Sequence, residues 1–239
     1  MKMTIQPFFV AGLTGLAATS AHAVPITIVD AGFEDDVITA DEFSSGDFDF
    51  TAWEEDRTNL ALTFAANGTG FAAFGIPGPK SGDQYALLHT NGNNGSSSLN
   101  QDTSLLWSSL AVGDTLTVKA WTTHRGTPPG DADTTFGFNE ADGSGISSDP
   151  IDVSAAAAAG VWTEQTWSYV VTQADLDAAA LGSWGAVNLQ IGISGSTSND
   201  DVKQVAFDDI SLEYTPVPEP ASLALIGLGG LLMMQRRRS

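Results

Sequence analysis

Few side chains in this sequence of 239 residues are of the types that perform catalysis. The only histidines are His22, His89 and His124, and there is no cysteine. The sequence contains no serine-centred nucleophile elbow, no zinc-binding helix motif and no phosphate-binding loop motif. Its 29 aspartates and glutamates could supply paired carboxylates, but glycosidase chemistry depends on their separation in space. We therefore expect a protein that is not an enzyme.

Aromatic and amide side chains favour carbohydrate binding instead, because sugars are held by aromatic surfaces together with a few well-placed polar groups. Trp121 has the opposite parity to the apolar residues of the stretch 115–122, so it faces outward if those residues are buried. Asn188 and Gln190 alternate in the same way with the apolar residues of 187–193. We expect Trp121, Asn188 and Gln190 to contact a glycan. The alternative, that Trp121 is one more core tryptophan, stays open.

The scaffold that must position these side chains is predicted to be all-β. Ten short apolar or alternating stretches are bounded by Gly, Asn, Asp, Ser and Pro, a spacing typical of a two-sheet β-sandwich. These stretches are 26–30, 62–66, 71–75, 84–90, 97–101, 115–122, 134–138, 162–171, 187–193 and 204–214. One helix is predicted after a capping box that begins at Thr172. The alanines at 155–159 are too few for an isolated helix, so we expect a turn or loop there.

The last predicted strand contains a change of register. Val205 and Phe207 have one parity, whereas Ile210 has the other, so the apolar face changes between Asp208 and Asp209. A β-bulge at this point would return both sets of side chains to the same core. It would also redirect one of the two aspartates.

The N-terminal segment has the features of a secretory signal peptide. Lys2 is followed by an apolar stretch over 7–18 and by a small-residue site that ends at Ala23. We therefore expect a signal helix over residues 1–23 that is cleaved after Ala23. Residues 24–215 would then form the exported domain.

The C-terminal segment, residues 216–239, combines a Pro-Glu-Pro sequence, an apolar run at 221–234 and three arginines. The run is shorter than the roughly 20 residues that span a bilayer, but the arginines form a cationic stop that stays cytoplasmic. We expect a short apolar helix that holds the exported protein transiently in the membrane.

In their order and spacing, these three parts closely resemble the PEP-CTERM sorting signal of exported proteins in Gram-negative bacteria. The residues that carry the resemblance are Val217, Pro218, Glu219, Pro220, Arg236, Arg237 and Arg238. The resemblance implies that an exosortase, a membrane transpeptidase-like enzyme, is a partner. It also implies a location at the cell envelope, on the surface or in an extracellular matrix, in hosts of which many make extracellular polysaccharide.

Charge narrows the range of partners. The net charge is −20, and Lys2 and the three terminal arginines lie outside the exported domain, which is therefore more acidic still. Nucleic acids are excluded as partners, because binding them requires lysine and arginine to neutralise phosphates. Divalent cations are favoured. Without cysteine, burial and a possible metal ion must hold the exported domain together.

A second resemblance covers nearly the whole exported domain. "VDAGFED", Trp53, "SGDQYALL", Gln101, "VGDTLTVKAW" and "AFDDISLEY" follow the order seen in galactose-binding-like jelly rolls, including many carbohydrate-binding modules. In that family a structural calcium joins the first and last strand regions, which implies Glu34 and Asp208 as Ca²⁺ ligands. Asp30 stands where the family commonly has Asn. The other interpretation is that Glu34 and Asp208 are solvated residues at a sheet edge.

Together these patterns predict an exported, exosortase-processed β-sandwich that associates with extracellular polysaccharide without catalysis. Two alternatives remain open at this stage: a purely structural surface protein without a glycan site, and a glycan-active enzyme.

Overall fold

The computed structural model describes residues 21–36, 50–57, 62–67, 75–76, 78–91, 95–125, 133–139, 145–153, 158–194 and 202–218. Residues Ala23–Pro216 form one compact unit. The predicted signal helix, the C-terminal apolar helix and most of the predicted strand 71–75 lie outside the described residues. Within the described part, no helix is both long and apolar enough to cross a membrane.

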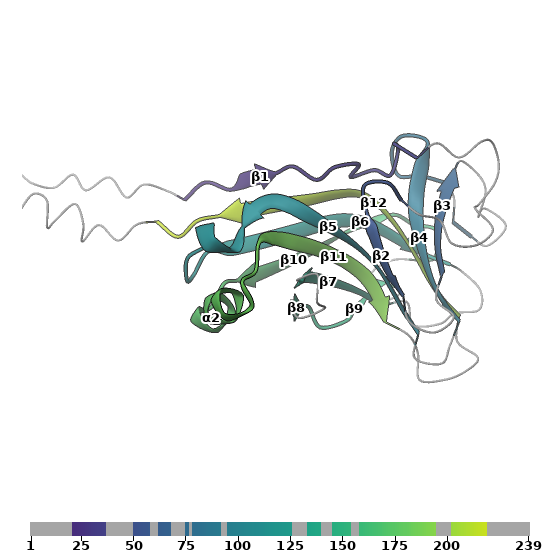
Figure 1. Cartoon of the computed structure of the whole chain (residues 1–239). Coiled ribbons are helices and arrows are strands. Elements are labelled where there is room, and N and C mark those ends of the chain that lie inside the picture. Colours follow the sequence, from purple (N-terminus) through teal and green to yellow (C-terminus); the bar gives the residue numbers. More distant parts are fainter. Residues whose placement is uncertain are drawn as a thin grey trace, which may run out of the picture. The chain divides into compact units, whose positions relative to one another are not determined.

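Two antiparallel sheets form a β-sandwich (Figure 1), which confirms the predicted fold class. The β12 sheet has the order β10 (Thr163–Val170), β6 (Thr115–His124), β12 (Val202–Thr215), β4 (Gln84–Asn91) and β3 (Leu62–Asn67), with β1 (Val24–Ile26) also paired to β12. The β11 sheet has the order β2 (Glu54–Arg57), β5 (Ser96–Leu106), β11 (Ala186–Ser194), β7 (Asp133–Asn139) and β8 (Gly145–Ser147), with β9 (Ile151–Asp152) paired to β7.

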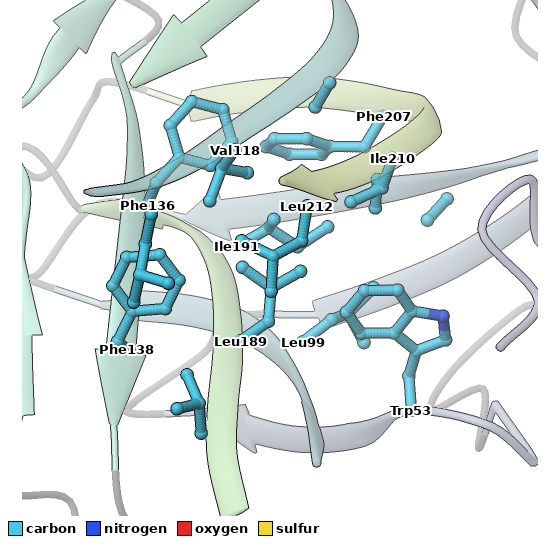
Figure 2. Close-up of a cluster of buried hydrophobic side chains, with 14 of the residues drawn as sticks. Trp53, Leu99, Val118, Phe136, Phe138, Leu189, Ile191, Phe207, Ile210 and Leu212 are labelled. Atoms are coloured by element: carbon cyan, nitrogen blue, oxygen red, sulfur yellow. The ribbon is translucent and has the colours of Figure 1, made fainter. Parts of the chain in front are cut away.

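The core lies between the two sheets because apolar residues alternate along their strands. Figure 2 shows side chains from both sheets directed toward one another. The labelled members, all nearly or fully buried, are Trp53, Leu99, Val118, Phe136, Phe138, Leu189, Ile191, Phe207, Ile210 and Leu212. Phe138 of β7 also stacks on Trp167 of the edge strand β10 with the ring centroids 5.2 Å apart, which joins the two sheets.

A second, smaller apolar cluster lies outside this core and joins β3, β4 and β12. Tyr85, Leu87 and Ala206 alternate with core residues on the outer face of the β12 sheet, and Ile76 and Trp162 pack against them. The Trp162 indole N–H donates to the Gly78 carbonyl at 2.9 Å. The segment before β4 therefore covers part of this outer face.

The predicted bulge in the last strand is confirmed. The pairing of β12 with β6 shifts register between Asp208 and Ser211, and Asp209 has a positive φ of 48°. Phe207 and Ile210, on either side of the shift, are both buried. The bulge thus returns both sets of apolar side chains to one core.

The first predicted strand is wrong over most of its length. β1 ends at Ile26, and residues 29–33 form turns with positive φ at Asp30 (48°) and Phe33 (60°). The Ala31 carbonyl instead accepts the N–H of Ile210 at 3.0 Å. A turn therefore lies against the bulge of β12 where the apolar pattern predicted a strand.

The predicted helix is confirmed as α2 (Gln173–Gly182), and Thr172 and Asp175 form both halves of its capping box. The short strands β2, β8 and β9 and the 3-10 helix η2 (Trp107–Ser109) were not predicted, because their few residues show no apolar alternation. Of the alanines at 155–159, only Ala158 and Ala159 are described, and Ala159 lies in a turn with Gly160.

Candidate functional site

Polar side chains form a row across the outer face of the β11 sheet. The register aligns Glu54 of β2 with Asn100 of β5, Asn100 with Gln190 of β11, and Gln190 with Gly137 of β7. Asn100 and Gln190 alternate with core residues, so their side chains lie on the outer face with that of the exposed Glu54, whereas Gly137 is buried. Asn188 and Asp102 form a second row beside the first.

Hydrogen bonds hold these amides in fixed orientations. Asn188 Nδ2 donates to Asp102 Oδ1 at 2.9 Å, and Gln190 Nε2 donates to Asn100 Oδ1 at 3.0 Å and to Ser98 Oγ at 3.2 Å. A preorganised row of this kind loses little side-chain entropy when a ligand binds.

A pocket of about 280 Å³ opens over part of these rows, and the predicted residue Gln190 is not among its lining residues. Its lining residues are Thr51, Ala52, Trp53, Glu54, Asn100, Gln101, Asp102 and Asn188. The volume is close to the lower end of the range for small-molecule sites. The pocket brings the predicted residue Asn188 together with Glu54, Asn100 and Asp102, which were not predicted.

Gln101 fixes the wall of the pocket from inside the sandwich. Its side-chain oxygen accepts the Val29 N–H at 2.8 Å, and its amide nitrogen donates to the carbonyls of Val29 and Ala52. Trp53 adds a bond from its indole N–H to the Asp30 carbonyl at 3.1 Å. Two chain segments remote in sequence are thereby held against β5.

The chemistry of the pocket is that of polar recognition. The charged residues of its lining are Glu54 and Asp102, both exposed, and both are acids. Trp53 is the one aromatic residue of the lining, and its side chain is only 3% exposed. Carboxylate oxygens accept hydrogen bonds from hydroxyl or ammonium groups, and side-chain amides both donate and accept. The pocket therefore suits a neutral or amine-bearing polyol and disfavours an anion.

Trp121 faces outward, as its parity predicted, but from the other sheet. It lies on β6 with its neighbours Val118 and Ala120 buried, and it is paired with Asp208 of β12. Lys80 Nζ lies 4.3 Å from the centroid of the Trp121 ring, so a cation already covers one ring face. The structure does not bring Trp121 together with Asn188 and Gln190, since they lie on the outer faces of opposite sheets.

The acids implied as calcium ligands gather where the first turn meets the bulge, in what we call the carboxylate clasp: Asp30, Glu34 and Asp208. Asp208 is fully buried. Its Oδ2 accepts the N–H groups of Lys80 and Ser81, at 2.8 and 3.0 Å, and its Oδ1 accepts the N–H of Asp209 at 2.8 Å. Burial, together with the neighbouring charge of Asp209, raises the pKa of Asp208 to about 6 against the opposing effect of the amide hydrogen bonds.

Glu34 and Asp30 are bound in the same manner. Glu34 Oε1 accepts the N–H groups of Asp83 and Gln84 at 2.9 and 3.0 Å, and Asp30 Oδ1 accepts those of Glu34 and Asp35. Desolvation raises the pKa of Asp30, and its Oδ2 is buried without a hydrogen-bond partner among the described residues. Backbone amides thus join the first turn, the segment before β4 and β12.

As a calcium site, the clasp is incomplete in the described part of the chain. Its donors are all oxygens, the type that Ca²⁺ prefers, but Ca²⁺ requires six to eight of them. No three acidic or histidine side chains of the described residues converge in a way that could hold a metal ion. Most of the clasp oxygens instead accept amide hydrogens.

Sequence reasoning missed Asn100, Asp102 and Glu54 for different reasons. Asn100 falls within a predicted strand, and its parity would have placed it outward beside Gln190 had the pairing of β5 with β11 been known. Asp102 lies one residue beyond that predicted strand. Glu54 lies in a polar stretch that shows no strand pattern.

Comparison with protein families identifies the C-terminal segment. Residues 216–238 match the PEP-CTERM protein-sorting motif, which confirms the resemblance noted in the sequence. The motif marks the chain as an exported protein with a C-terminal sorting signal. A search among curated proteins gives no match.

Carbohydrate-binding modules are among the solved structures similar to this chain. The CBM22-1 xylan-binding domain from Paenibacillus barcinonensis is 10% identical with a TM-score of 0.41, over 68% of this chain and 86% of that domain. A family 11 carbohydrate-binding module from Clostridium thermocellum is 10% identical with a TM-score of 0.38, over 78% and 93%. The active domain of tailspike protein 4 from bacteriophage CBA120 is 12% identical with a TM-score of 0.40, over 68% of this chain and only 19% of its own.

Proposed function

We propose that the sandwich is a non-catalytic module that binds extracellular polysaccharide through the outer face of its β11 sheet. The observation that carries this proposal is the pocket over Asn100, Asp102 and Asn188, in which Asn188 donates to Asp102 and Asn100 accepts from the neighbouring Gln190. Such a surface exchanges hydrogen bonds with sugar hydroxyls at little entropic cost. The sequence resemblance to carbohydrate-binding jelly rolls supports the same assignment.

The charge of the pocket selects the class of glycan. Glu54 and Asp102 repel uronate and sulfate groups and attract hydroxyl and ammonium groups. The proposed ligands are therefore neutral or amine-bearing polysaccharides. A glycan array that compares neutral, hexosamine-rich and uronic-acid polymers tests this selection directly.

Two variants assign the glycan to one face or the other. Asn188→Ala, in the pocket of the β11 sheet, should weaken binding by roughly tenfold through loss of a hydrogen bond. Trp121→Ala, on the β12 sheet, should leave it unchanged. The reverse result would move the site to Trp121, and turnover of any bound polymer would mark the protein as an enzyme.

We further propose that an exosortase of a Gram-negative host processes the C-terminal segment and releases the domain to the cell surface or matrix. The motif match over 216–238 supports this step. Intact mass of the mature protein tests it: the tail with Arg236–Arg238 should be absent. A mature protein that keeps its arginines would refute processing.

As a separate proposal, the carboxylate clasp binds a structural Ca²⁺ ion. Asp30, Glu34 and Asp208 would hold the ion, and Asp30 Oδ2, which is buried without a hydrogen-bond partner among the described residues, would be free to bind it. The ion would join the first turn to β12 and so add stability to the folded state.

A further inference from the structure

Exposed apolar side chains gather at one end of the sandwich. Of the large hydrophobic residues of the described sandwich that are exposed, five lie there. They are Val24 (46% exposed), Leu106 (49%), Val112 (50%), Val170 (53%) and Leu181 (90%). Exposed hydrophobic residues scattered singly are ordinary, but a group at one end indicates a contact surface.

Strand register places these residues together. Val170, the last residue of β10, is paired with Thr115 of β6, which is paired with Thr215 at the end of β12. Val112 lies in the turn before β6, where the Gly113 N–H donates to the Val171 carbonyl at 2.8 Å.

Leu106 and Leu181 complete this end from the other sheet and from α2. Leu106 ends β5 and is paired with Ala186 at the start of β11. α2 leads into the same strand, and Trp184 after the helix packs against Trp107 with ring centroids 5.1 Å apart. We call Leu106, Val112, Val170 and Leu181 the apolar rim.

The chain leaves the sandwich at this same end. Figure 1 shows the end of β12 at the same end of the sandwich as α2, and β1 begins there as well because Val24 is paired with Tyr214. Five residues, 216–220, separate Thr215 from the apolar run. A proline-rich segment of this length extends about 16 Å at roughly 3.1 Å per residue.

We propose that the apolar rim rests on the lipid–water interface of the membrane while the C-terminal segment is still uncleaved. The inference rests on the proposed membrane association of that segment, whose short linker keeps the rim within reach of the bilayer. Exposed leucine and valine side chains gain free energy by entering the headgroup boundary. Asp177 is exposed on α2 and the domain is acidic overall, so the surface suits zwitterionic rather than anionic lipid.

Fluorescent labelling at single sites can test this orientation, because the chain has no native cysteine. The full chain would carry a dye at Val112→Cys in the rim or at Val161→Cys. Val161 is a matched control: it is 51% exposed and precedes β10, whereas Val170 ends that strand, roughly 30 Å away at 3.3 Å per residue. Each protein is reconstituted in phosphatidylcholine vesicles that contain a spin-labelled lipid quencher.

The expected result is quenching that is several-fold stronger at position 112 than at position 161. Leu106→Ser combined with Leu181→Ser should reduce the quenching at position 112 to the level of the control, without changing glycan binding. In a variant with a long Gly/Ser insertion after Pro216, the dye at position 112 should still be quenched. The contact of the apolar rim with the lipid, and not the short linker, would then hold the domain in this orientation.

Three results would overturn the proposal. Equal quenching at the two positions, in protein that floats with the vesicles, refutes the contact of the apolar rim with lipid but not the membrane association of the C-terminal segment. Loss of rim quenching in the long-linker variant assigns the orientation to the tether. Protein that does not float at all refutes membrane association of the tail, and the rim proposal falls with it, whereas glycan binding by the domain is unaffected.

Discussion

Asp208 should make the stability of the domain depend on pH in an unusual direction. Its carboxylate is fully buried, and burial raises its pKa from 3.8 to about 6. Because the folded state binds this proton more tightly than the unfolded state, the contribution of Asp208 to stability rises as pH falls from about 6 toward 3.8. Above pH 6 the full cost of the buried charge is present.

The size of the effect follows from these two pKa values. Their difference corresponds to at most about 3 kcal/mol, and screening at a site beside the exposed Asp209 reduces this to about 1–2 kcal/mol. Asp208→Asn removes the titration. Its single amide oxygen accepts fewer of the three N–H groups, so the variant is also less stable than the native protein at low pH.

Denaturant unfolding at pH 4 and pH 7.5, with chelator present, measures this difference. The stability of Asp208→Asn relative to the native protein should increase by about 1–2 kcal/mol between pH 4 and pH 7.5. Asp177→Asn, exposed on α2, is the control for loss of one charge and should change stability by less than about 0.5 kcal/mol. A relative stability of Asp208→Asn that is independent of pH would refute the reasoning. A change of opposite sign would mean that the amide bonds outweigh burial.

Three further predictions concern the clasp and α2. Gly82→Ala should destabilise the domain by about 2 kcal/mol, because φ is +59° and the new Cβ would overlap Glu34 Oε1; Gly185→Ala, in open space, should have little effect in the same melting assay. Ca²⁺ should raise the melting temperature more than Mg²⁺ at equal ionic strength, because an ion bound only by the folded state adds up to about 2.7 kcal/mol of stability at a hundredfold excess over its Kd. Asp208→Asn should remove the difference between the two ions, and equal responses in the native protein would leave only charge screening. Thr172→Ala should cost about 1 kcal/mol, since Thr172 caps α2, and an unchanged melting temperature would contradict the importance of that cap.

Local periodicity was sufficient to predict which way many side chains face. The outward direction of Trp121, the bulge at Asp208 and the start of α2 at Thr172 each depend on a few neighbouring residues. Such features are encoded within one strand or one turn of helix, so they can be predicted from the sequence.

The pairing between strands could not be predicted from local sequence patterns. Trp121 and Asn188 both face outward, but only the strand order shows that they belong to opposite sheets. The donors of the clasp are backbone N–H groups near Ser81 and Gln84, which every residue type except proline possesses. Glu54 joins the pocket only because β2 pairs with β5. These contacts between distant segments arise from the fold as a whole.

The measurement that tests the central claim most directly is calorimetric titration of the exported domain with a neutral polysaccharide, for the native protein, Asn188→Ala and Trp121→Ala. A glycan site on the β11 sheet predicts a Kd between micromolar and millimolar for the native domain, a range of about −8 to −4 kcal/mol. Asn188→Ala should bind roughly tenfold more weakly, and Trp121→Ala should match the native protein. Native affinity in Asn188→Ala, or stronger binding to a uronic-acid polymer than to a neutral one, would contradict a glycan site on the β11 sheet.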